Sequence, residues 1–516
     1  MKFELDLKSP KHKIERYWEF CVGSCHAATA LREDYRIQLK KCRKELGFRY
    51  VRFHGLFDDD MSVMKKNLDG AYKLSFANID NIFDFLLDIG MKPFIELSFM
   101  PSCLKSGEQT IFHYKGVTTP PNDPQMWVFL IKSFVGHITE RYGRDEVRRW
   151  YFEVWNEPNL GGESGMKDVG FWTGTMEDYY RLYALTANAI KEIDAFYRVG
   201  GPATSNNAYI SETIGFCKKN NVPLDFVSTH HYPTDVVLGY GVENSRNFVK
   251  EFSETDKNDK KALSALVSEY ITFKRTLWEK VDRGVLTDMA VHARKEAGDL
   301  PLFYTEWSSL AGFATDGSFG ASFIAKTVAD NLGLVNGYAY WTFSDIFEED
   351  GFPSSAYSGG YGLMTIDGIP KAPYCAFELL HKLGDAVYEK KFAQGTVDIY
   401  AFRDESNSTL QLLCVNHNSL QHDIKEETVD IELSGNKFSP YPPDVLRIDD
   451  EHANSLALWE KSDRPVSLSA AQKLRLLAES ELVRETVRAE TNGNSLKTNI
   501  TLPPMGTALI TVYLEK

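Results

Sequence analysis

The chain has 516 residues, of which 43% are hydrophobic and 25% are charged, and this composition excludes a globally disordered protein. Its formal net charge of −14 argues against a nucleic acid or an anionic membrane as a partner, and we predict neither. The sequence has no run of 18 apolar residues and no hydrophobic signal segment, which predicts a cytoplasmic protein. The seven scattered cysteines are typical of reduced thiols in that compartment.

Strands and helices alternate from about residue 16 onward. Short β-branched or aromatic runs predict eight strands, at 17–23, 48–54, 92–98, 150–155, 197–201, 225–230, 301–306 and 337–343. Amphipathic segments predict helices at 31–46, 78–89, 125–142, 176–193, 208–220 and 318–332. This pattern predicts an α/β fold, a (β/α)8 TIM barrel over residues 16–350. A doubly wound open sheet competes with it, but no glycine-rich phosphate loop follows the first strand.

Two connections between a predicted strand and the next helix are too long for simple loops. Residues 98–124 carry several aromatic side chains and two consecutive prolines, and we expect them to form part of a pocket wall. Residues 235–285 have helical patterning around 260–278, which predicts a small helical insertion over the mouth of the barrel.

The pattern changes after about residue 365. Short β-rich runs at 397–402, 409–416, 428–433 and 507–514 are separated by turn residues, and a charged segment at 453–477 interrupts them. Phe3, Leu5 and Leu7 alternate with charged residues, which predicts a strand within residues 1–15. We therefore predict an additional C-terminal antiparallel β-sandwich domain built from residues 1–15 and 365–516.

Two of the predicted strands end in a glutamate with a tryptophan nearby. In W-Y-F-E-V-W-N-E-P-N (150–159), Pro158 cannot join a sheet ladder and leaves Glu157 at the carboxyl end of the strand. Glu306 has the same place in P-L-F-Y-T-E-W-S (301–308). Catalytic residues of parallel barrels lie at this end of the strands, so the two glutamates are predicted to face one pocket. Paired carboxylates are the minimum equipment for cleaving a glycosidic bond, whereas two solvated strand-end residues would rarely have such aromatic neighbours.

Side-chain alternation groups further residues on the strand faces directed at this pocket: Arg52 with His54, Glu153 and Trp155 with Glu157, and His230 with Tyr232. The result is a polar pocket with aromatic walls, which suits the hydroxyl groups and the apolar face of a sugar ring. No spacing resembles H-E-x-x-H or a facial metal triad, so we predict neither a metal nor another cofactor.

Several of these segments together resemble glycoside hydrolase family 39, which contains β-xylosidases and α-L-iduronidases. The segments that carry the resemblance are R-F-H-G-L-F-D-D-D (52–60), F-E-V-W-N-E-P-N (152–159), T-H-H-Y (229–232), Y-T-E-W (304–307) and Y-W-T-F-S-D-I-F-E-E (340–349). The similarity covers the barrel and extends to residues 447–454. One departure is the segment between Tyr232 and Pro301, which is longer than in the family's xylosidases.

The resemblance implies a retaining mechanism with Glu157 as acid/base and Glu306 as nucleophile. The family's sugar contacts would fall on His54, Asn156, His230, Tyr232, Trp341 and Glu348. Glu157 must stay protonated to act as the acid, and burial beside a second carboxylate would raise its pKa. Arg52 and Tyr232 are the groups expected to favour a charge on Glu306.

We therefore expect an exo-acting retaining glycosidase that hydrolyses β-D-xylosides and releases β-D-xylose from short xylo-oligosaccharides. An α-L-iduronidase would need cations facing the sugar carboxylate, but the segment at Glu348, Glu349 and Asp350 is acidic. An α-L-arabinofuranosidase of the same clan is a second alternative. An inactive carbohydrate-binding barrel would lack one of the two glutamates, and both are present. A homo-oligomer is compatible with the sequence.

Overall fold

The computed structural model describes residues 1–162, 170–235, 251, 255 and 259–515. Its centre is a closed barrel of eight strands, each parallel to both of its neighbours. In spatial order the strands are β3 (Cys21–His26), β4 (Tyr50–His54), β7 (Lys92–Leu97), β10 (Tyr151–Val154), β11 (Arg198–Thr204), β12 (Phe226–His231), β13 (Leu302–Trp307) and β14 (Gly337–Tyr340). The predicted (β/α)8 barrel is confirmed.

Several predicted strand boundaries are wrong, among them the ends of the fifth strand, at Thr204, and of the eighth, at Tyr340. Local structure explains two others. The first strand begins at Cys21, because Tyr17–Glu19 form a short 3-10 helix before it. The fourth strand ends at Val154, because Trp155 has a φ of 71° and leaves the extended conformation. The predicted alternation therefore does not reach Glu157, and the turn after the strand determines the position of that side chain.

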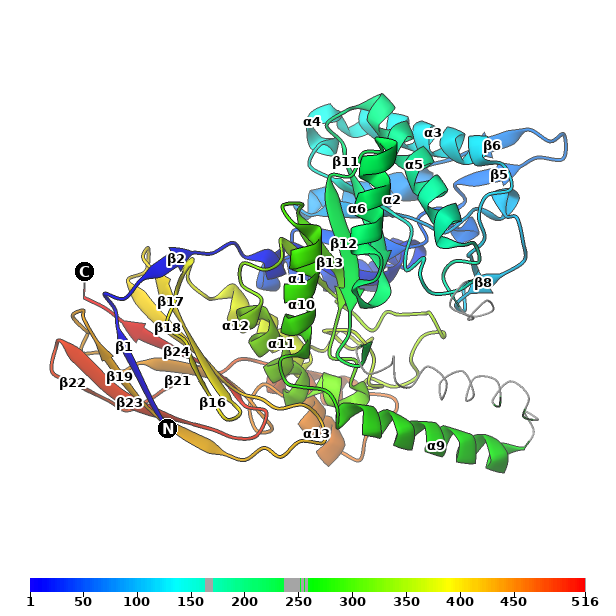
Figure 1. The fold of residues 1–516 in the computed structure, drawn as a ribbon. Coiled ribbons are helices and arrows are strands. Elements are labelled where there is room, and N and C mark those ends of the chain that lie inside the picture. Colours follow the sequence, from blue (N-terminus) through cyan, green and yellow to red (C-terminus); the bar gives the residue numbers. More distant parts are fainter. Residues whose placement is uncertain (163–169, 236–250, 252–254, 256–258, 516) are drawn as a thin grey trace.

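Helices surround the barrel and follow its strands in sequence (Figure 1). They are α1 (Glu33–Leu46), α2 (Ala77–Asp88), α3 (Pro124–Tyr142), α4 (Arg144–Val147), α5 (Met176–Ile193), α6 (Ile210–Asn220), α10 (Val285–Ala297), α11 (Ser318–Asp330) and α12 (Ala372–His381). The sequence predicted neither α10 nor α12. Helix α12 lies in the range assigned to the accessory domain, yet it packs against α1 and α11. We therefore propose that the barrel unit extends to the end of α12.

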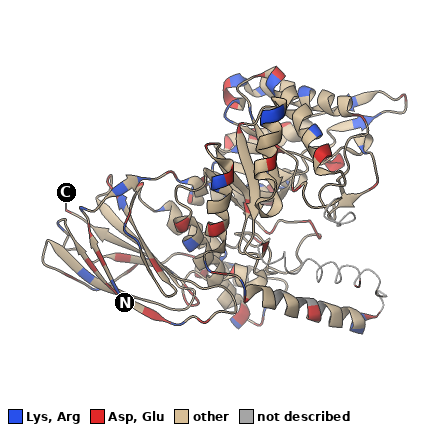
Figure 2. Ribbon diagram, viewed as in Figure 1, with Lys and Arg blue, Asp and Glu red and all other residues tan. Residues whose placement is uncertain are grey.

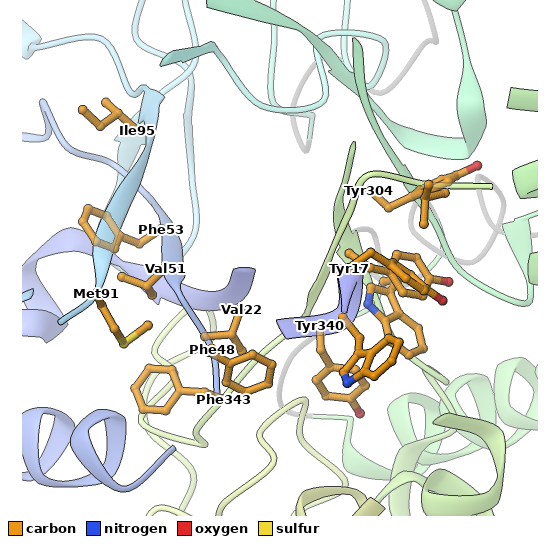
Figure 3. Close-up of a cluster of buried hydrophobic side chains, with 14 of the residues drawn as sticks. Tyr17, Val22, Phe48, Val51, Phe53, Met91, Ile95, Tyr304, Tyr340 and Phe343 are labelled. Carbon is orange, nitrogen blue, oxygen red and sulfur yellow. The ribbon is translucent and has the colours of Figure 1, made fainter. Parts of the chain in front are cut away.

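Successive side chains along each strand face two different regions, the interior of the barrel and the layer between the strands and the helices. Val51 and Phe53 of β4 point outward to the helices, while Arg52 and His54 point into the barrel. Figure 3 shows Val51 and Phe53 with Val22, Met91 and other members of the outer core. Polar side chains thus enter the barrel without disturbing the apolar contact between strands and helices.

The amino-terminal end of the barrel is filled by aromatic rings. They are Phe20, Tyr50, Phe94, Tyr151, Phe226 and Phe303. The rings of Phe20 and Phe303 stack with their centroids 4.8 Å apart. Gly337 of β14 lies against this pair, and a Cβ atom there would be 2.3 Å from Phe20 and 2.6 Å from Phe303. This plug closes the end of the barrel opposite to the one expected to hold the active site.

A second unit consists of two sheets that pack on a separate hydrophobic core. One sheet contains β1 (Lys2–Asp6), β19 (Glu427–Ser434), β22 (Ala489–Thr491) and β23 (Ser495–Leu502). The other contains β2 (Lys11–Lys13), β15 (Ala386–Tyr388), β16 (Phe392–Gln394), β17 (Val397–Asp404), β18 (Thr409–Asn416), β20 (Asp444–Ile448), β21 (Glu485–Thr486) and β24 (Thr507–Tyr513). The predicted C-terminal sandwich is confirmed, with one parallel pair, β1 with β19, among its antiparallel strands.

The N-terminal strand belongs to this second unit, as the sequence predicted. In Figure 1 the blue strand β1 lies among the orange and red strands from the end of the chain. Phe3, Leu5 and Leu7 are buried in the sandwich core. The charged segment predicted at 453–477 contains α13 (Ser455–Lys461) and most of α14 (Ala470–Glu479).

The predicted insertion at 235–285 lies partly outside the described residues, at 236–250, 252–254 and 256–258. Its described part contains α9 (Lys260–Trp278), which projects from the body of the molecule (Figure 1). Trp278 packs edge-on against Phe319 of α11. Arg283 donates to Asp398 of β17, so the end of the insertion is attached to both units.

Charged residues of both signs are interspersed over both units (Figure 2). Within the described part of the chain, no helix is both long and apolar enough to cross a membrane.

The aromatic plug generates a stability prediction. Gly337→Ala should destabilise the protein by about 1–3 kcal/mol, because the added methyl group overlaps two packed rings that have little freedom to move. The matched control is Gly136→Ala in α3, where no heavy atom lies within 4 Å of the added carbon. Alanine is the better helix former, so the control should be neutral or stabilising by about 0.5–1 kcal/mol. Thermal unfolding of the two variants checks the prediction, and equal shifts in Tm would contradict it.

Candidate active site

The two predicted glutamates lie together at the carboxyl end of the barrel. Glu306 is the fifth residue of β13, and Glu157 follows β10 by three residues. Both are buried, with 5% and 7% of their surface exposed. One oxygen of each carboxyl group and one ring nitrogen of His230 all lie within 4.8 Å of one another. The pairing expected from the two strand ends is therefore present.

A strained turn places Glu157. Glu157 has a φ of 42°, and its backbone N–H donates to the carbonyl of Ala203 in β11 at 2.8 Å. Positive φ is uncommon for residues other than glycine and is concentrated at functional sites. Trp155, which was expected to share a face with Glu157, instead donates its indole N–H to the carbonyl of Phe171 and packs against Trp172.

Arg52 is fully buried beneath the two glutamates and binds four side chains. Its Nε donates to Glu153 at 2.6 Å, and Nη1 donates to Glu306 at 2.9 Å. Nη2 lies 2.7 Å from Oδ1 of Asn156 and 2.9 Å from Glu96. Burial lowers the pKa of Arg52, but the three glutamates outweigh burial and raise it overall. The guanidinium thus stays charged and holds these side chains with its planar set of donors.

Both oxygens of Glu306 accept hydrogen bonds. Oε1 accepts from Arg52, and Oε2 accepts from the hydroxyl of Tyr232 at 2.8 Å. Burial and the charge of Glu306 raise the pKa of Tyr232 well above its usual value, so the phenol keeps its hydrogen. These are the two contacts expected from the sequence, and together they provide the donors that an ionised carboxylate requires.

Glu157 has a different environment. Its Oε1 is 2.9 Å from Nδ1 of His230. Burial raises the pKa of Glu157 well above its usual value, Glu306 and Asp235 add to this effect, and Arg52 opposes it. Burial and the charge of Arg52 hold the pKa of His230 well below its usual value. These two shifts favour a protonated Glu157 beside a neutral imidazole of His230.

His54 and Trp341 form the next part of the pocket. His54 Nδ1 is 2.7 Å from Glu96, and Nε2 is 3.7 Å from Oε1 of Glu306. The rings of His54 and Trp341 are 4.7 Å apart. Phe112, from the connection expected to form a wall, stacks 6.1 Å from His54. Asn156 also lies here, and its Nδ2 is buried without a hydrogen-bond partner, which leaves a donor for a ligand.

The adjacent Glu348 and Glu349 have different partners. The resemblance assigned a sugar contact to Glu348, whose carboxylate lies 3.0 Å from Nδ1 of His26. The carboxyl of Glu349 instead lies 3.9 Å from Nε2 of His54. Burial raises the pKa of Glu349 well above its usual value, and the charge of Glu306 adds to this effect. Glu349 is therefore close to Glu306 and His54, although no role was assigned to it from the sequence.

His26 joins three segments at the rim of the pocket. Its Nε2 is 2.9 Å from Asp60, after β4, and its Nδ1 contacts Glu348, after β14. The ring of Tyr114, between β7 and α3, stacks on it with centroids 3.9 Å apart. Burial lowers the pKa of His26, but hydrogen bonds to Asp60, Cys25 and Glu348 outweigh this and raise it well above its usual value. We call His26, Asp60, Glu348 and Tyr114 the rim clamp.

Three further residues lie in the site but were not predicted from the sequence, namely Glu96, Thr305 and Glu349. Glu96 could have been identified from the sequence, because it is an acidic residue inside the otherwise apolar run that follows Lys92 in β7 (K-P-F-I-E-L). A charge is rarely fully buried unless it is paired, so such a residue indicates a buried cation nearby. Thr305 carried no comparable signal, since threonine is common in strands.

Among the described residues, one group could hold a metal ion by distance, namely Glu157, His230 and Glu306. The guanidinium of Arg52, 2.9 Å from Glu306, would repel a cation there. The prediction that no metal takes part stays a prediction.

The chain matches the family model Glycosyl hydrolases family 39 over residues 1–264 and 279–496. It belongs to this family. It is 43% identical to a beta-xylosidase of Caldicellulosiruptor saccharolyticus, covering 99% of this chain and 98% of that protein. A beta-xylosidase of Geobacillus stearothermophilus is 32% identical, over 88% of this chain and 84% of that protein. The crystal structure of a monomeric beta-xylosidase from Caulobacter crescentus CB15 has a TM-score of 0.80 and 30% identity, with 99% of both chains covered.

The family membership makes the chain a glycoside hydrolase, as its resemblance to family 39 implied. The long match to two beta-xylosidases includes the residues on both sides of the predicted insertion. The fold and the enzyme class are thus established independently of the geometry of the site.

The rim clamp generates a prediction about stability and pH. A raised pKa in the folded state means that the charge of His26 stabilises the fold fully below the unfolded value of about 6.5. This contribution is lost as the pH rises through the folded-state pKa. His26→Gln should therefore lower Tm by a few degrees near pH 6, and the difference from the wild type should shrink at higher pH.

The matched control is His292→Gln, because His292 is exposed and its ion pair with Glu296 lies in solvent. Its Tm difference should be small at every pH. Thermal unfolding followed over a pH series measures both variants, and a Tm difference for His26→Gln that does not change with pH would show that the clamp is uncharged.

Proposed function

We propose that the protein is a retaining exo-glycosidase that hydrolyses β-D-xylosides by double displacement. The observation that carries the proposal is the short distance between the two carboxyl groups, with one oxygen of Glu157 and one of Glu306 within 4.8 Å. Retaining glycosidases keep their carboxyl groups about 5–5.5 Å apart, whereas inverting enzymes need about 6.5–9.5 Å to admit a water molecule. A separation this short supports direct attack by one carboxylate on the sugar.

In the first step, Glu306 attacks the anomeric carbon while Glu157 gives its proton to the departing oxygen. The environments of the two residues support this assignment. Glu306 accepts hydrogen bonds from Arg52 and Tyr232 on its two oxygens, and Glu157 is held protonated by burial and by neighbouring negative charge. The bond from the anomeric carbon to the leaving oxygen breaks, and an ester between Glu306 and the sugar forms.

In the second step, Glu157 acts as a base. It removes a proton from a water molecule that attacks the same carbon, and Glu306 leaves with its electron pair. The loss of the negative charge of Glu306 in the ester lowers the pKa of Glu157, which eases its change from acid to base. The sugar is released with the configuration it had in the substrate.

The sugar is expected to contact Asn156 through its unpartnered Nδ2 and Trp341 through its flat ring. Glu349 is a better candidate than Glu348 for a hydroxyl group, because it lies beside His54 and Glu306. The N–H of His113 donates to the carbonyl of Glu349 at 2.5 Å. This bond joins the wall segment to the connection after β14, which supports a closed, single-ring site and hence exo action.

Xylosides are the best-supported substrates for two reasons. The two curated relatives that match most of the chain are both named beta-xylosidase. A uronate would also bring a negative charge toward Glu349 and Glu306, and Arg52 already donates to four side chains. An α-L-arabinofuranosidase is the remaining alternative. The cytoplasmic location and the homo-oligomer stay predictions from the sequence.

The two glutamates should respond differently to substitution. Glu306→Ala should abolish turnover of every substrate. Glu157→Ala should lower kcat/KM for xylobiose by about 10²–10⁴-fold, because the leaving oxygen of that substrate needs a proton. Its kcat/KM for dinitrophenyl β-xyloside, whose leaving group needs no proton, should stay close to that of the wild type, while loss of the base in the second step lowers kcat.

Azide provides the control on these roles. It should rescue Glu157→Ala and give a β-xylosyl azide, because it attacks the glycosyl-enzyme from the face that water uses. Rescue of Glu306→Ala with the same β stereochemistry would mean that the two roles are reversed.

Substrate choice is tested with aryl glycosides. We expect kcat/KM to be higher for β-D-xyloside than for α-L-iduronide or α-L-arabinofuranoside, because mismatched polar groups in a buried site cost more than the roughly 1–3 kcal/mol of one apolar group. Xylo-oligosaccharides should release single xylose units. A preference for the iduronide, or internal fragments from polymeric xylan, would contradict the proposal.

A further inference from the structure

A line of three buried side chains runs from Glu157 back to Arg52, and the two proposed steps use none of them. Nδ1 of His230 faces Glu157, and its Nε2 is 3.1 Å from the hydroxyl of Thr305. That hydroxyl donates to Oε1 of Glu153 at 2.8 Å. The other oxygen of Glu153 accepts from Nε of Arg52 at 2.6 Å. His230, Thr305 and Glu153 are at most 1% exposed, so solvent does not interrupt the line. We call these three residues the proton-holding chain.

When Thr305 donates to Glu153, valence assigns the other hydrogen atoms along this chain. A threonine hydroxyl has one hydrogen, and Thr305 uses it on Glu153. Its oxygen can therefore only accept from His230, so Nε2 of His230 carries a hydrogen. A neutral imidazole has one N–H group, which leaves Nδ1 bare and able only to accept. The group that faces Nδ1 is the carboxyl of Glu157, which must then be the donor.

The chain could also run in the opposite direction. A protonated Glu153 would donate to Thr305, Thr305 to Nε2 of His230, and Nδ1–H of His230 to an ionised Glu157. Both directions hold the same number of hydrogens, so a fixed charge must select between them. Arg52 makes that selection, because its Nε–H is directed at Glu153 and favours the ionised form of that carboxylate.

We propose that Thr305 is a positioning residue that, together with Glu153, selects the His230 tautomer that holds a proton on Glu157 in the free enzyme. The proposal rests on the proposed function, because it explains how Glu157 is kept ready as the acid. In the first step only the hydrogen of Glu157 moves to the leaving oxygen, and those of Thr305 and His230 stay in place. The bare Nδ1 then faces a carboxylate to which it cannot donate, which strengthens Glu157 as a base for the second step.

Other charges also act on this region, and the test must leave them unchanged. Glu157 faces Glu306, Asp235 and Glu349, which favour its protonated form, and Arg52, which opposes it. His230 faces Arg52, His54 and His231, all of which disfavour a second proton on the ring.

Glu153, at the far end, faces Arg52 and Glu96. Burial raises the pKa of Glu153 and Glu96 adds to this effect, whereas Arg52 lowers it, so Arg52 is the charge that favours the ionised form. The buried groups of Cys21 and Tyr179 also lie within its electrostatic reach. Thr305 itself carries no charge. Its substitution by valine therefore removes the hydroxyl and alters none of these charges.

The experiment compares Thr305→Val with the wild type in the pH dependence of kcat/KM for xylobiose. The alkaline limb of this profile reports loss of the proton from Glu157 in the free enzyme. Without the hydroxyl, His230 is free to place its hydrogen on Nδ1 and donate to an ionised Glu157. The alkaline limb should therefore move to lower pH by about one unit. Thr305→Ser restores the hydroxyl and should bring the limb back to the wild-type position.

A matched control separates the chain from a general loss of packing. Thr229→Val removes another buried hydroxyl from the adjacent strand β12, where it donates to the carbonyl of Thr204. This variant should leave the alkaline limb in place. The effect of Thr305→Val should also be smaller for dinitrophenyl β-xyloside, because its leaving group needs no proton.

The proposal is overturned if Thr305→Val lowers kcat/KM equally at every pH, or if Thr229→Val moves the limb as far. If Thr305→Val does not fold, Glu153→Gln takes its place, since the amide would donate to Thr305 and reverse the chain. An unmoved limb in that variant also overturns the proposal. A failure of the proposed function gives a different result. If Glu157 were not the acid, Glu157→Gln would keep the alkaline limb of the wild type.

Discussion

The buried guanidinium of Arg52 is the interaction on which the rest of the site depends. It is the common partner of Glu96, Glu153 and Glu306, which come from three different strands. One positive charge cannot neutralise these three carboxylates and a fourth at Glu157. Among these four, Glu157 is the carboxyl group for which the structure shows no hydrogen bond from Arg52, so the local charge balance favours its protonated form. The difference between the proposed acid and the proposed nucleophile thus originates in which carboxyl groups one cation reaches.

The barrel strands hold the polar side chains of the site in fixed positions. The aromatic plug fills one end, and the alternation of β4 directs Arg52 and His54 into the other. The connections that line the pocket are longer and have fewer regular elements to hold them. The rim clamp and the bond between His113 and Glu349 join these connections to one another. Rigid strands therefore position the reacting groups, while a few polar contacts position the walls around the sugar.

Much of this arrangement follows from local patterns. The eight strand runs and the two glutamates at strand ends are visible in the sequence because burial and strand ends leave clear composition signals. The turn at Trp155 and Glu157 is not visible, because a carbonyl of the neighbouring strand β11 stabilises it. The packing of helix α12 on α1 and α11 is likewise not visible, since these helices are distant from it in the sequence. The different partners of Glu348 and Glu349 are not visible either, because Glu348 contacts His26, some 320 residues away.

The parallel pairing of β1 with β19 has a consequence for how the molecule is made. The first strand of the chain has no partner until Ser434 has left the ribosome. At about 5–20 residues per second, that delay is roughly 20–90 seconds, long enough for the whole barrel to be synthesised and to begin folding. During this time Phe3, Leu5 and Leu7 lack their partner strand β19, and the core that they join is incomplete. Completion of the sandwich is therefore a late event in biosynthesis, because β1 is translated long before the strand with which it pairs.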